Sequence, residues 1–301
     1  MLPSVNASSE QFLTDLDRIQ SAIDTTQRQV SSGLRVGKAS DDPSALSSIL
    51  GTQSEIALNK QAQTNLNQVK TELQVGDSAL QQAVKLMDQA ITLAAQAGST
   101  LGSDTQNAVL ASQVQGVQEA LVGLSNTSVN GRYIFSGDSA RQAAYALDAT
   151  EPSGVRQVST ASSTRVITDA NGNPLWTPQT AREIFDAQGG TGNVFTAIDD
   201  LLTAFQKNDR SAALATMDSL KAAADHVNQQ LGLYGIAETR VDDATTAAAK
   251  SVTTGTQSLS SLRDADTAGD AVELTQLGIQ QQAALSARAK MSQYNLFDFL
   301  A

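Results

Sequence analysis

Few residues of this chain have a type and spacing that could support catalysis. His226 is its only histidine, so a Ser-His-Asp triad would depend on that one residue, which stands in an alanine-rich helical stretch. Three pairs of adjacent aspartates occur, at 41-42, 199-200 and 242-243. Neighbours on a helix do not face one another as a general acid and a general base must. We therefore expect no catalytic residue and no enzyme activity.

GLRVGKA, residues 33–39, has some features of a phosphate-binding loop. That loop requires four residues between its glycines and a Ser or Thr after the lysine, whereas this segment has three residues and then Ala39. We interpret the segment as part of a hinge in which Arg35 and Lys38 are solvated.

Asp264, Asp266 and Gly269 occupy positions one, three and six of a calcium loop. Ala268 and Thr275 stand at positions five and twelve, where the loop needs oxygen ligands and a glutamate. The aspartates are better explained as residues that cap a helix end. The sequence thus predicts no metal site and no cofactor.

Composition narrows the possible partners. The formal charge is −11, with 20 basic and 31 acidic residues and no basic patch, so nucleic acid is an unexpected partner. The chain has no cysteine and no run of about 18 apolar residues that could cross a bilayer. The segment MLPSVNASSEQF lacks a positive region followed by an apolar one, so we do not expect secretion by a cleaved signal. The aromatic fraction of 4% favours long helices with thin seams, hence a rod.

The hinge interrupts two helical patterns. Residues 10–31 carry an apolar stripe, and Pro43 suits the first turn of the next helix. Glycines relieve backbone strain in such a turn, and Ser40 or Asp41 can accept hydrogen bonds from free N–H groups. The predicted hinge residues are Gly33, Gly37, Asp41, Asp42 and Pro43.

Apolar residues spaced by three and four then follow over long stretches, as in coiled coils. One stripe runs from Leu66 to Ala94 and a second from Leu110 to Leu124. A third continues from Leu214 to Leu262, although Gly232 and Gly235 could break it, and its helix begins after Asn208 or Asp209. The last helix is expected to start near Asp270, with Glu273 completing a capping box.

Between these helical parts the pattern changes. Short β-branched and aromatic runs separated by turn residues occupy about 130–186, and seven of the chain's twelve aromatics lie between Tyr133 and Phe205. Asn171-Gly172 predicts a hairpin through a type I′ turn. We predict a mainly α protein with a small β-rich insert, in which 1–45 and 255–301 form terminal coiled-coil arms, 46–130 and 190–254 a helical rod, and 131–189 an outer β-rich domain.

Both ends of the chain resemble the bacterial flagellin superfamily. SSGLRVGKASDDPSALSSIL near the start and LRDADTAGDAVELTQLGIQQQAALSA near the end are similar to the paired ends of that superfamily. Within it, NGRYIFSGDSARQAAY, AREIFD and NVFTAIDDLLTAFQKND resemble the hook-associated proteins of the hook–filament junction. A short filament flagellin is the alternative, and an enzyme is a distant third.

The resemblance implies an extracellular structural adaptor of the flagellum, exported unfolded through the flagellar type III apparatus. Its expected partners are the first hook-associated protein, flagellin, other copies of the chain in a helical lattice, and an export chaperone. It also implies that the terminal arms pair in an assembly seam, formed by Leu16, Ile23, Val30, Val252, Leu259, Leu262, Leu274 and Leu285.

Overall fold

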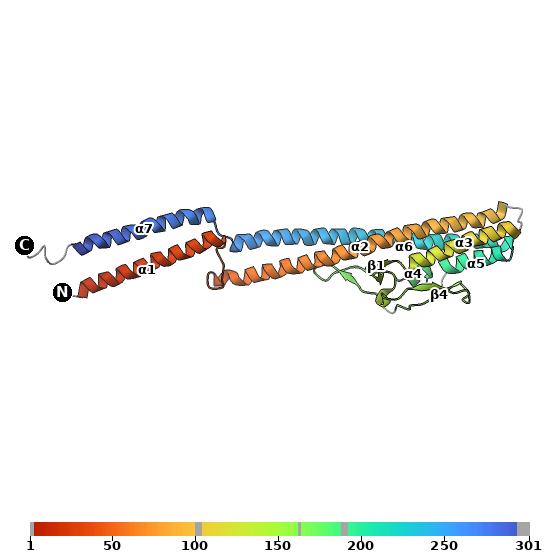
Figure 1. The fold of residues 1–301 in the computed structure, drawn as a ribbon, viewed down its shortest axis with the longest axis horizontal. Coiled ribbons are helices and arrows are strands. Elements are labelled where there is room, and N and C mark those ends of the chain that lie inside the picture. The colour runs from red at the N-terminus through yellow and green to blue at the C-terminus, as the bar shows by residue number, and fades with distance from the viewer. Residues whose placement is uncertain (1–2, 100–103, 162–163, 188–191, 294–301) are drawn as a thin grey trace, which may run out of the picture. The chain divides into compact units, whose positions relative to one another are not determined.

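The structure is a computed structural model that describes residues 3–99, 104–161, 164–187 and 192–293. It confirms the mainly α prediction (Figure 1). The helices are α1 (Pro3–Ser32), α2 (Pro43–Ser99), α3 (Asp104–Ser125), η1 (Gly137–Ser139), α4 (Ala181–Phe185), α5 (Val194–Gln206), α6 (Arg210–Arg263) and α7 (Thr267–Gln293).

The chain forms two compact units. The terminal unit comprises residues 1–58 and 251–301, and the central unit comprises residues 59–250. Helices α2 and α6 each contribute to both units. The finer division into arms, rod and outer domain stays a prediction.

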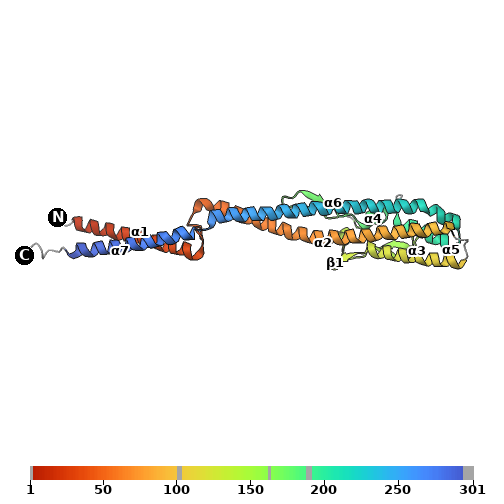
Figure 2. The same ribbon diagram turned by 90° about the horizontal axis from the view of Figure 1, so that it is seen from above.

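In the central unit, α2 and α6 lie side by side and α3 runs along α5 (Figures 1 and 2). The predicted stripe of α2 is the centre of its core, because apolar side chains that recur every three or four residues share one helix face. Every member of that stripe is buried: Leu66, Val69, Leu73, Gly76, Leu80, Ala83, Met87, Ala90 and Ala94.

The stripe of α6 is buried less evenly. Leu220, Val227, Tyr234 and Val241 are buried, whereas the exposed fraction of Leu214 is 38%. Gly232 and Gly235 do not break the helix, which continues through all 54 residues of α6. Burial of the apolar face on both sides of the glycines explains this, because packing outweighs the roughly 1 kcal/mol that a helical glycine costs relative to alanine.

The β-rich insert contains three separate two-stranded antiparallel sheets within the described residues. These sheets pair β1 (Ser128–Val129) with β2 (Arg132–Tyr133), β3 (Tyr145–Leu147) with β4 (Val155–Gln157), and β5 (Ile167–Thr168) with β6 (Pro174–Trp176).

The predicted hairpin at Asn171-Gly172 is present between β5 and β6, but its turn is not type I′. Of the two residues only Gly172 has a positive φ. The Asp169 carboxylate instead accepts hydrogen bonds from the backbone N–H groups of Asn171 and Asn173, both at 2.8 Å, and so holds a longer loop. A two-residue turn with positive φ at both positions occurs at Asn130-Gly131, between β1 and β2.

Aromatic side chains connect the insert to the helices of the central unit. Tyr234 of α6 makes edge contacts with Phe135 and Trp176, with ring centroids 6.1 and 5.0 Å apart. Phe185 contacts both Phe135 and Phe195. The predicted concentration of aromatics therefore forms a continuous cluster, with two members from outside the insert, Phe195 of α5 and Tyr234 of α6.

The observed starts of the helices agree only in part with those predicted from the sequence. The Asp209 carboxylate caps α6 by accepting from the N–H of Ala212, as predicted. The capping box at Asp270 and Glu273 is wrong, because α7 begins at Thr267 and the Asp266 carboxylate accepts from the N–H of Gly269.

Candidate assembly site

The terminal unit joins segments that lie more than two hundred residues apart in sequence. Helix α1 ends at Ser32 because Gly33 adopts a φ of +70° and donates its N–H to the carbonyl of Gln29 at 2.8 Å. This left-handed residue is the usual helix stop, since glycine has no Cβ to clash there. The chain then turns toward the segment between α6 and α7.

Backbone hydrogen bonds tie the two segments together. Leu34 and Asp264 form an antiparallel bridge, and the Ala265 N–H donates to the Gly33 carbonyl at 3.0 Å. The Arg263 carbonyl accepts from the N–H groups of both Arg35 and Val36, at 2.8 and 3.1 Å. Val36 is also buried, so this crossing has a small apolar centre of its own.

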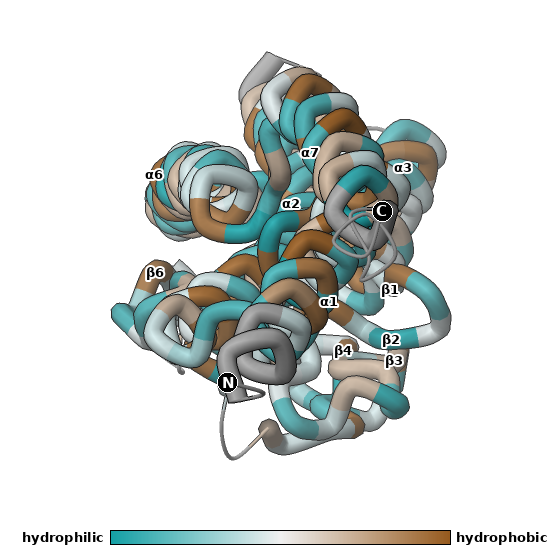
Figure 3. Tube along the Cα trace, turned by 90° about the vertical axis from the view of Figure 1, so that its left-hand side faces the viewer, coloured by the Kyte–Doolittle hydropathy of each residue, from teal (hydrophilic) through white to brown (hydrophobic). Residues whose placement is uncertain are grey.

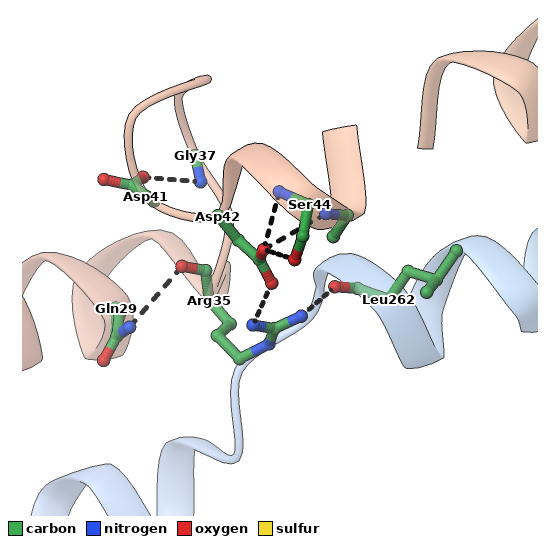
Figure 4. Close-up of polar contacts among 8 residues, drawn as sticks. Gln29, Arg35, Gly37, Asp41, Asp42, Ser44 and Leu262 are labelled. Atoms are coloured by element: carbon green, nitrogen blue, oxygen red, sulfur yellow. Dashed lines mark hydrogen bonds and ion pairs between the residues drawn. The ribbon is translucent and has the colours of Figure 1, made fainter. Parts of the chain in front are cut away.

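Arg35 adds a side-chain bridge at the same place (Figure 4). Its Nη1 lies 3.1 Å from Asp42 Oδ2, and its Nη2 donates to the Leu262 carbonyl at 2.6 Å. One guanidinium therefore connects the start of α2 to the end of α6. The expectation that Arg35 is merely solvated is wrong, because its planar fork of donors satisfies two acceptors at once.

Asp42, rather than the predicted Ser40 or Asp41, is the N-terminal cap of α2. Its Oδ1 accepts from the Ser44 hydroxyl at 2.6 Å and from the N–H groups of Ser44 and Ala45 at 3.2 and 3.1 Å. These hydrogen bonds favour the ionised carboxylate. The Ser44 hydroxyl and the Arg35 guanidinium, in that order, lower the pKa of Asp42 to about 2.

Asp41 organises the loop itself rather than the helix. Its Oδ2 accepts from the N–H groups of Lys38 and Gly37, at 2.9 and 3.0 Å, and the Lys38 bond is the main reason that the pKa of Asp41 is lowered. Gly37 does not have a positive φ, whereas Pro43 is the first residue of α2. The structure places all five predicted hinge residues in this loop and at its exit; bending there stays a prediction.

Helices α1 and α7 pack along each other, yet they bury little. Polar contacts cross the pair, from Gln281 to Gln20 at 2.7 Å and from Arg288 to Ser9 at 2.6 Å, and the Arg288 guanidinium lies 5.6 Å from the centre of the Phe12 ring. Among the described side chains of the two helices, none that is apolar is fully buried. Apolar residues recur along both helices in Figure 3.

The predicted seam residues occupy three helices. Leu16, Ile23 and Val30 are half-buried on α1, as is Leu274 on the adjacent α7. Val252, Leu259 and Leu262 are half-buried on α6, and Leu285 of α7 is 49% exposed. Three further apolar residues of α1 and α7 lie outside the predicted set and are more exposed than any member of it: Leu13, Val272 and Ile279, with exposed fractions of 58%, 59% and 64%.

The remaining chemical motifs have structural explanations. His226 Nε2 lies 2.7 Å from the Glu183 carbonyl, so the half-buried imidazole links α6 to α4. No group of three or more His, Cys, Asp or Glu residues with the geometry to hold a metal ion occurs in the described ranges. None of the described helices has an apolar stretch suited to crossing a bilayer.

Comparison with known proteins matches both helical ends. Residues 4–140 match the bacterial flagellin N-terminal helical region, and residues 217–300 match the bacterial flagellin C-terminal helical region. Flagellar hook-associated protein 3 of Escherichia coli is 28% identical over 67% of this chain, and the match spans 66% of that protein's length. Flagellin of Bacillus subtilis is 23% identical over 98% of both chains.

The fold also has a counterpart among solved structures. A flagellar hook-associated protein from Vibrio parahaemolyticus superposes with a TM-score of 0.65, covering 74% of this chain and 100% of that one at 21% identity. At this identity the likeness concerns the fold. Since the two matched regions include both the joined termini and most of the long helices, the chain belongs to the bacterial flagellin family.

Proposed function

We propose that this protein is a structural adaptor of the bacterial flagellum that joins the hook, through the first hook-associated protein, to the flagellin filament. The observation that carries the proposal is the α1–α7 pair, which exposes large apolar side chains on both helices and has no fully buried apolar side chain among its described residues. Two helices with so thin a core gain stability by packing against further helices. Neighbouring subunits of a lattice would supply them.

Two features favour a junction protein over a filament subunit. The E. coli relative is a hook-associated protein, and the β-rich insert is small. The alternative, a short filament flagellin, is favoured by the B. subtilis relative, which aligns over nearly the whole length. A growth assay separates the two, because a junction protein adds a limited zone whereas a flagellin polymerises without limit.

Seeded assembly tests the proposal directly. Purified protein is mixed with isolated hook ends that carry the first hook-associated protein, and the product is measured by electron microscopy. We expect a short addition that stops and that then lets added flagellin polymerise. Continuous growth would instead identify a filament flagellin, and failure to add to competent hook ends would contradict both functions.

Within this function we propose that the terminal helices form the seam between subunits. Leu259 and Leu262 are half-buried near the end of α6, close in sequence to the crossing at Arg263. Replacing both residues by aspartate, Leu259→Asp with Leu262→Asp, puts two charges at these half-buried positions. We expect loss of addition to hook ends and of motility, while the fluorescence of Trp176 in the central unit stays unchanged.

Two exposed serines on the same helix supply the control. Ser258→Asp with Ser261→Asp adds the same charge to the same stretch of α6 but leaves the leucines in place. This variant is expected to assemble normally. Normal motility of the leucine variant would contradict the seam.

The route to the flagellum is part of the same proposal. We infer export through the flagellar type III apparatus without a cleaved signal, assisted by an export chaperone, and an extracellular site of action. The sparsely buried terminal unit supports it, because a segment with little core costs little to keep unfolded. A strain that lacks the flagellar export apparatus should retain the protein inside the cell.

A further inference from the structure

A groove on the β-rich insert has the residue types of a protein interface. Two hollows of about 280 and 750 Å³ lie next to each other and share Arg132, Asp138 and Ala140. The smaller is lined by Tyr133, Trp176 and Arg165, and the larger includes Arg141. We call the two together the arginine groove.

Two arginines of the groove have no partner within the described part of the chain. The guanidinium groups of Arg132 and Arg141 are exposed and make no ion pair or hydrogen bond there. Arg165, by contrast, donates to Glu72 Oε2 of α2 at 2.7 Å, which fixes one wall of the smaller hollow. The Asp138 carboxylate also lines both hollows, so the groove has a net charge of +1 beside a preformed aromatic wall.

The composition of the insert also favours a protein interface. Residues 126–193 contain five arginines, no lysine and six acidic residues, which gives this segment a formal charge of −1. Arginine, tyrosine and tryptophan are enriched at protein interfaces and lysine is depleted, because the guanidinium binds carboxylates bidentately and stacks on aromatic rings. An ordinary solvated surface would have no reason to avoid lysine.

The rest of the chain has an excess of carboxylates over basic side chains. With −1 in residues 126–193, the remainder has −10 of the total of −11. We propose that the arginine groove docks an acidic segment of a second copy of this chain, with Arg132 and Arg141 pairing its carboxylates and the Tyr133–Trp176 wall holding its apolar side chains. This inference rests on the proposed self-association and identifies one surface that serves it.

Charge reversal is the first test. In Arg132→Glu with Arg141→Glu the groove repels the segment that it is proposed to bind, so association between copies should weaken at least about tenfold. Lys85→Glu with Lys221→Glu is the matched control, because both lysines are exposed on helices, form no ion pair with a described residue, and their replacement changes the total charge equally. Sedimentation of the purified chain at about 50 mM salt, where charges are weakly screened, measures the effect.

Crosslinking identifies the occupant. The chain has no cysteine, so Gln142→Cys places a single benzophenone label in the larger hollow while both arginines remain. In a mixture of ¹⁴N and ¹⁵N chains we expect mixed-isotope crosslinks to a segment rich in Asp and Glu, lost in the Arg132→Glu, Arg141→Glu background and kept in the lysine control. The proposal is overturned if no mixed-isotope crosslinks form, or if they form equally well in the charge-reversed background.

The two proposals can fail separately. Wild-type chain that does not add to hook ends contradicts the adaptor function, whatever the groove binds. Wild-type chain that adds normally, together with an arginine variant that adds equally well and gives unchanged crosslinks between copies, contradicts the groove alone.

Discussion

The two units of this protein are built from similar helices but have different interiors. In the central unit a continuous cluster of buried apolar side chains runs from Leu66 to Val241. Among the described residues of the terminal unit only Val36, Ile49 and Ile56 are both apolar and fully buried. The central unit therefore has a core of its own, whereas the terminal unit is held mainly by hydrogen bonds at the Arg35 crossing and by half-buried leucines.

This difference shows where the molecule can depend on partners. Burial of apolar area stabilises by roughly 25 cal/mol per Å², so the central unit is stable without neighbours and the terminal unit gains most from them. The difference can be tested because Trp176 is the only tryptophan and lies in the central unit. Its fluorescence reports unfolding of that unit alone.

The largest expected change in the free energy of unfolding comes from a prediction that compares one leucine of each unit. Leu80 is completely buried, so Leu80→Ala should lower the free energy of unfolding of the central unit by about 2–5 kcal/mol. Leu274→Ala removes the same atoms from a half-buried site of the terminal unit and should leave the Trp176 transition in urea unchanged. Equal shifts of that transition would mean that the two units share one cooperative core.

The spacing of apolar residues predicts part of this difference between the two units. The stripe from Leu66 to Ala94 was predicted and is buried throughout, because a regular spacing places its members on one helix face. The seam residues follow the same spacing but are only half-buried. A pattern of apolar residues shows which face of a helix packs against another helix. It does not show whether that second helix belongs to the same chain.

Contacts across long sequence separations were harder to predict. Arg35 is joined to Leu262 through a backbone carbonyl, which any residue offers, so nothing in the sequence marks the pairing.

The type I′ turn was assigned to Asn171-Gly172, although Asn130-Gly131 has the same residues and adopts it. Asp169, two residues before Asn171, is the signal that could have separated the two sites, because its carboxylate holds the longer loop.

A second prediction concerns how tightly the central unit is packed. A Cβ on Gly76 would lie 2.6 Å from a ring carbon of Tyr234, which is itself buried against Trp176 and Phe135. Overpacking of about 1–3 kcal/mol should outweigh the helix propensity gain of about 1 kcal/mol, so Gly76→Ala destabilises the unit. Urea denaturation followed by Trp176 fluorescence measures the loss.

Gly235→Ala is the control for that substitution. It lies in the same unit, inside α6, and its added Cβ meets no atom within 4 Å. This variant should be more stable than wild type by about 0.5–1 kcal/mol. A loss of stability in both variants would show that something other than the Tyr234 contact is responsible.

The third prediction concerns the terminal unit. Arg35→Ala removes both guanidinium contacts, with Asp42 and with the Leu262 carbonyl. Because the side chain is 45% exposed, the cost should be modest, about 1 kcal/mol. Faster amide hydrogen exchange at Val36 and Ala265 would report it, with no change in the Trp176 transition. Arg35→Lys should restore only part of the protection, since an ammonium group lacks the planar fork.

The smallest effect is the pH dependence of the same crossing. The pKa of Asp42 is lowered from 3.8 to about 2, chiefly by the Ser44 hydroxyl and then by Arg35. A carboxyl group whose folded pKa is depressed stabilises the fold above its unfolded value, and that stabilisation is lost as the pH falls from about 3.8 to about 2. NMR titration of Asp42, together with amide exchange at Ala45, should follow this loss. Arg35→Ala should raise the Asp42 pKa only partway, because the Ser44 bond remains; a full return to 3.8 would assign the shift to the guanidinium instead.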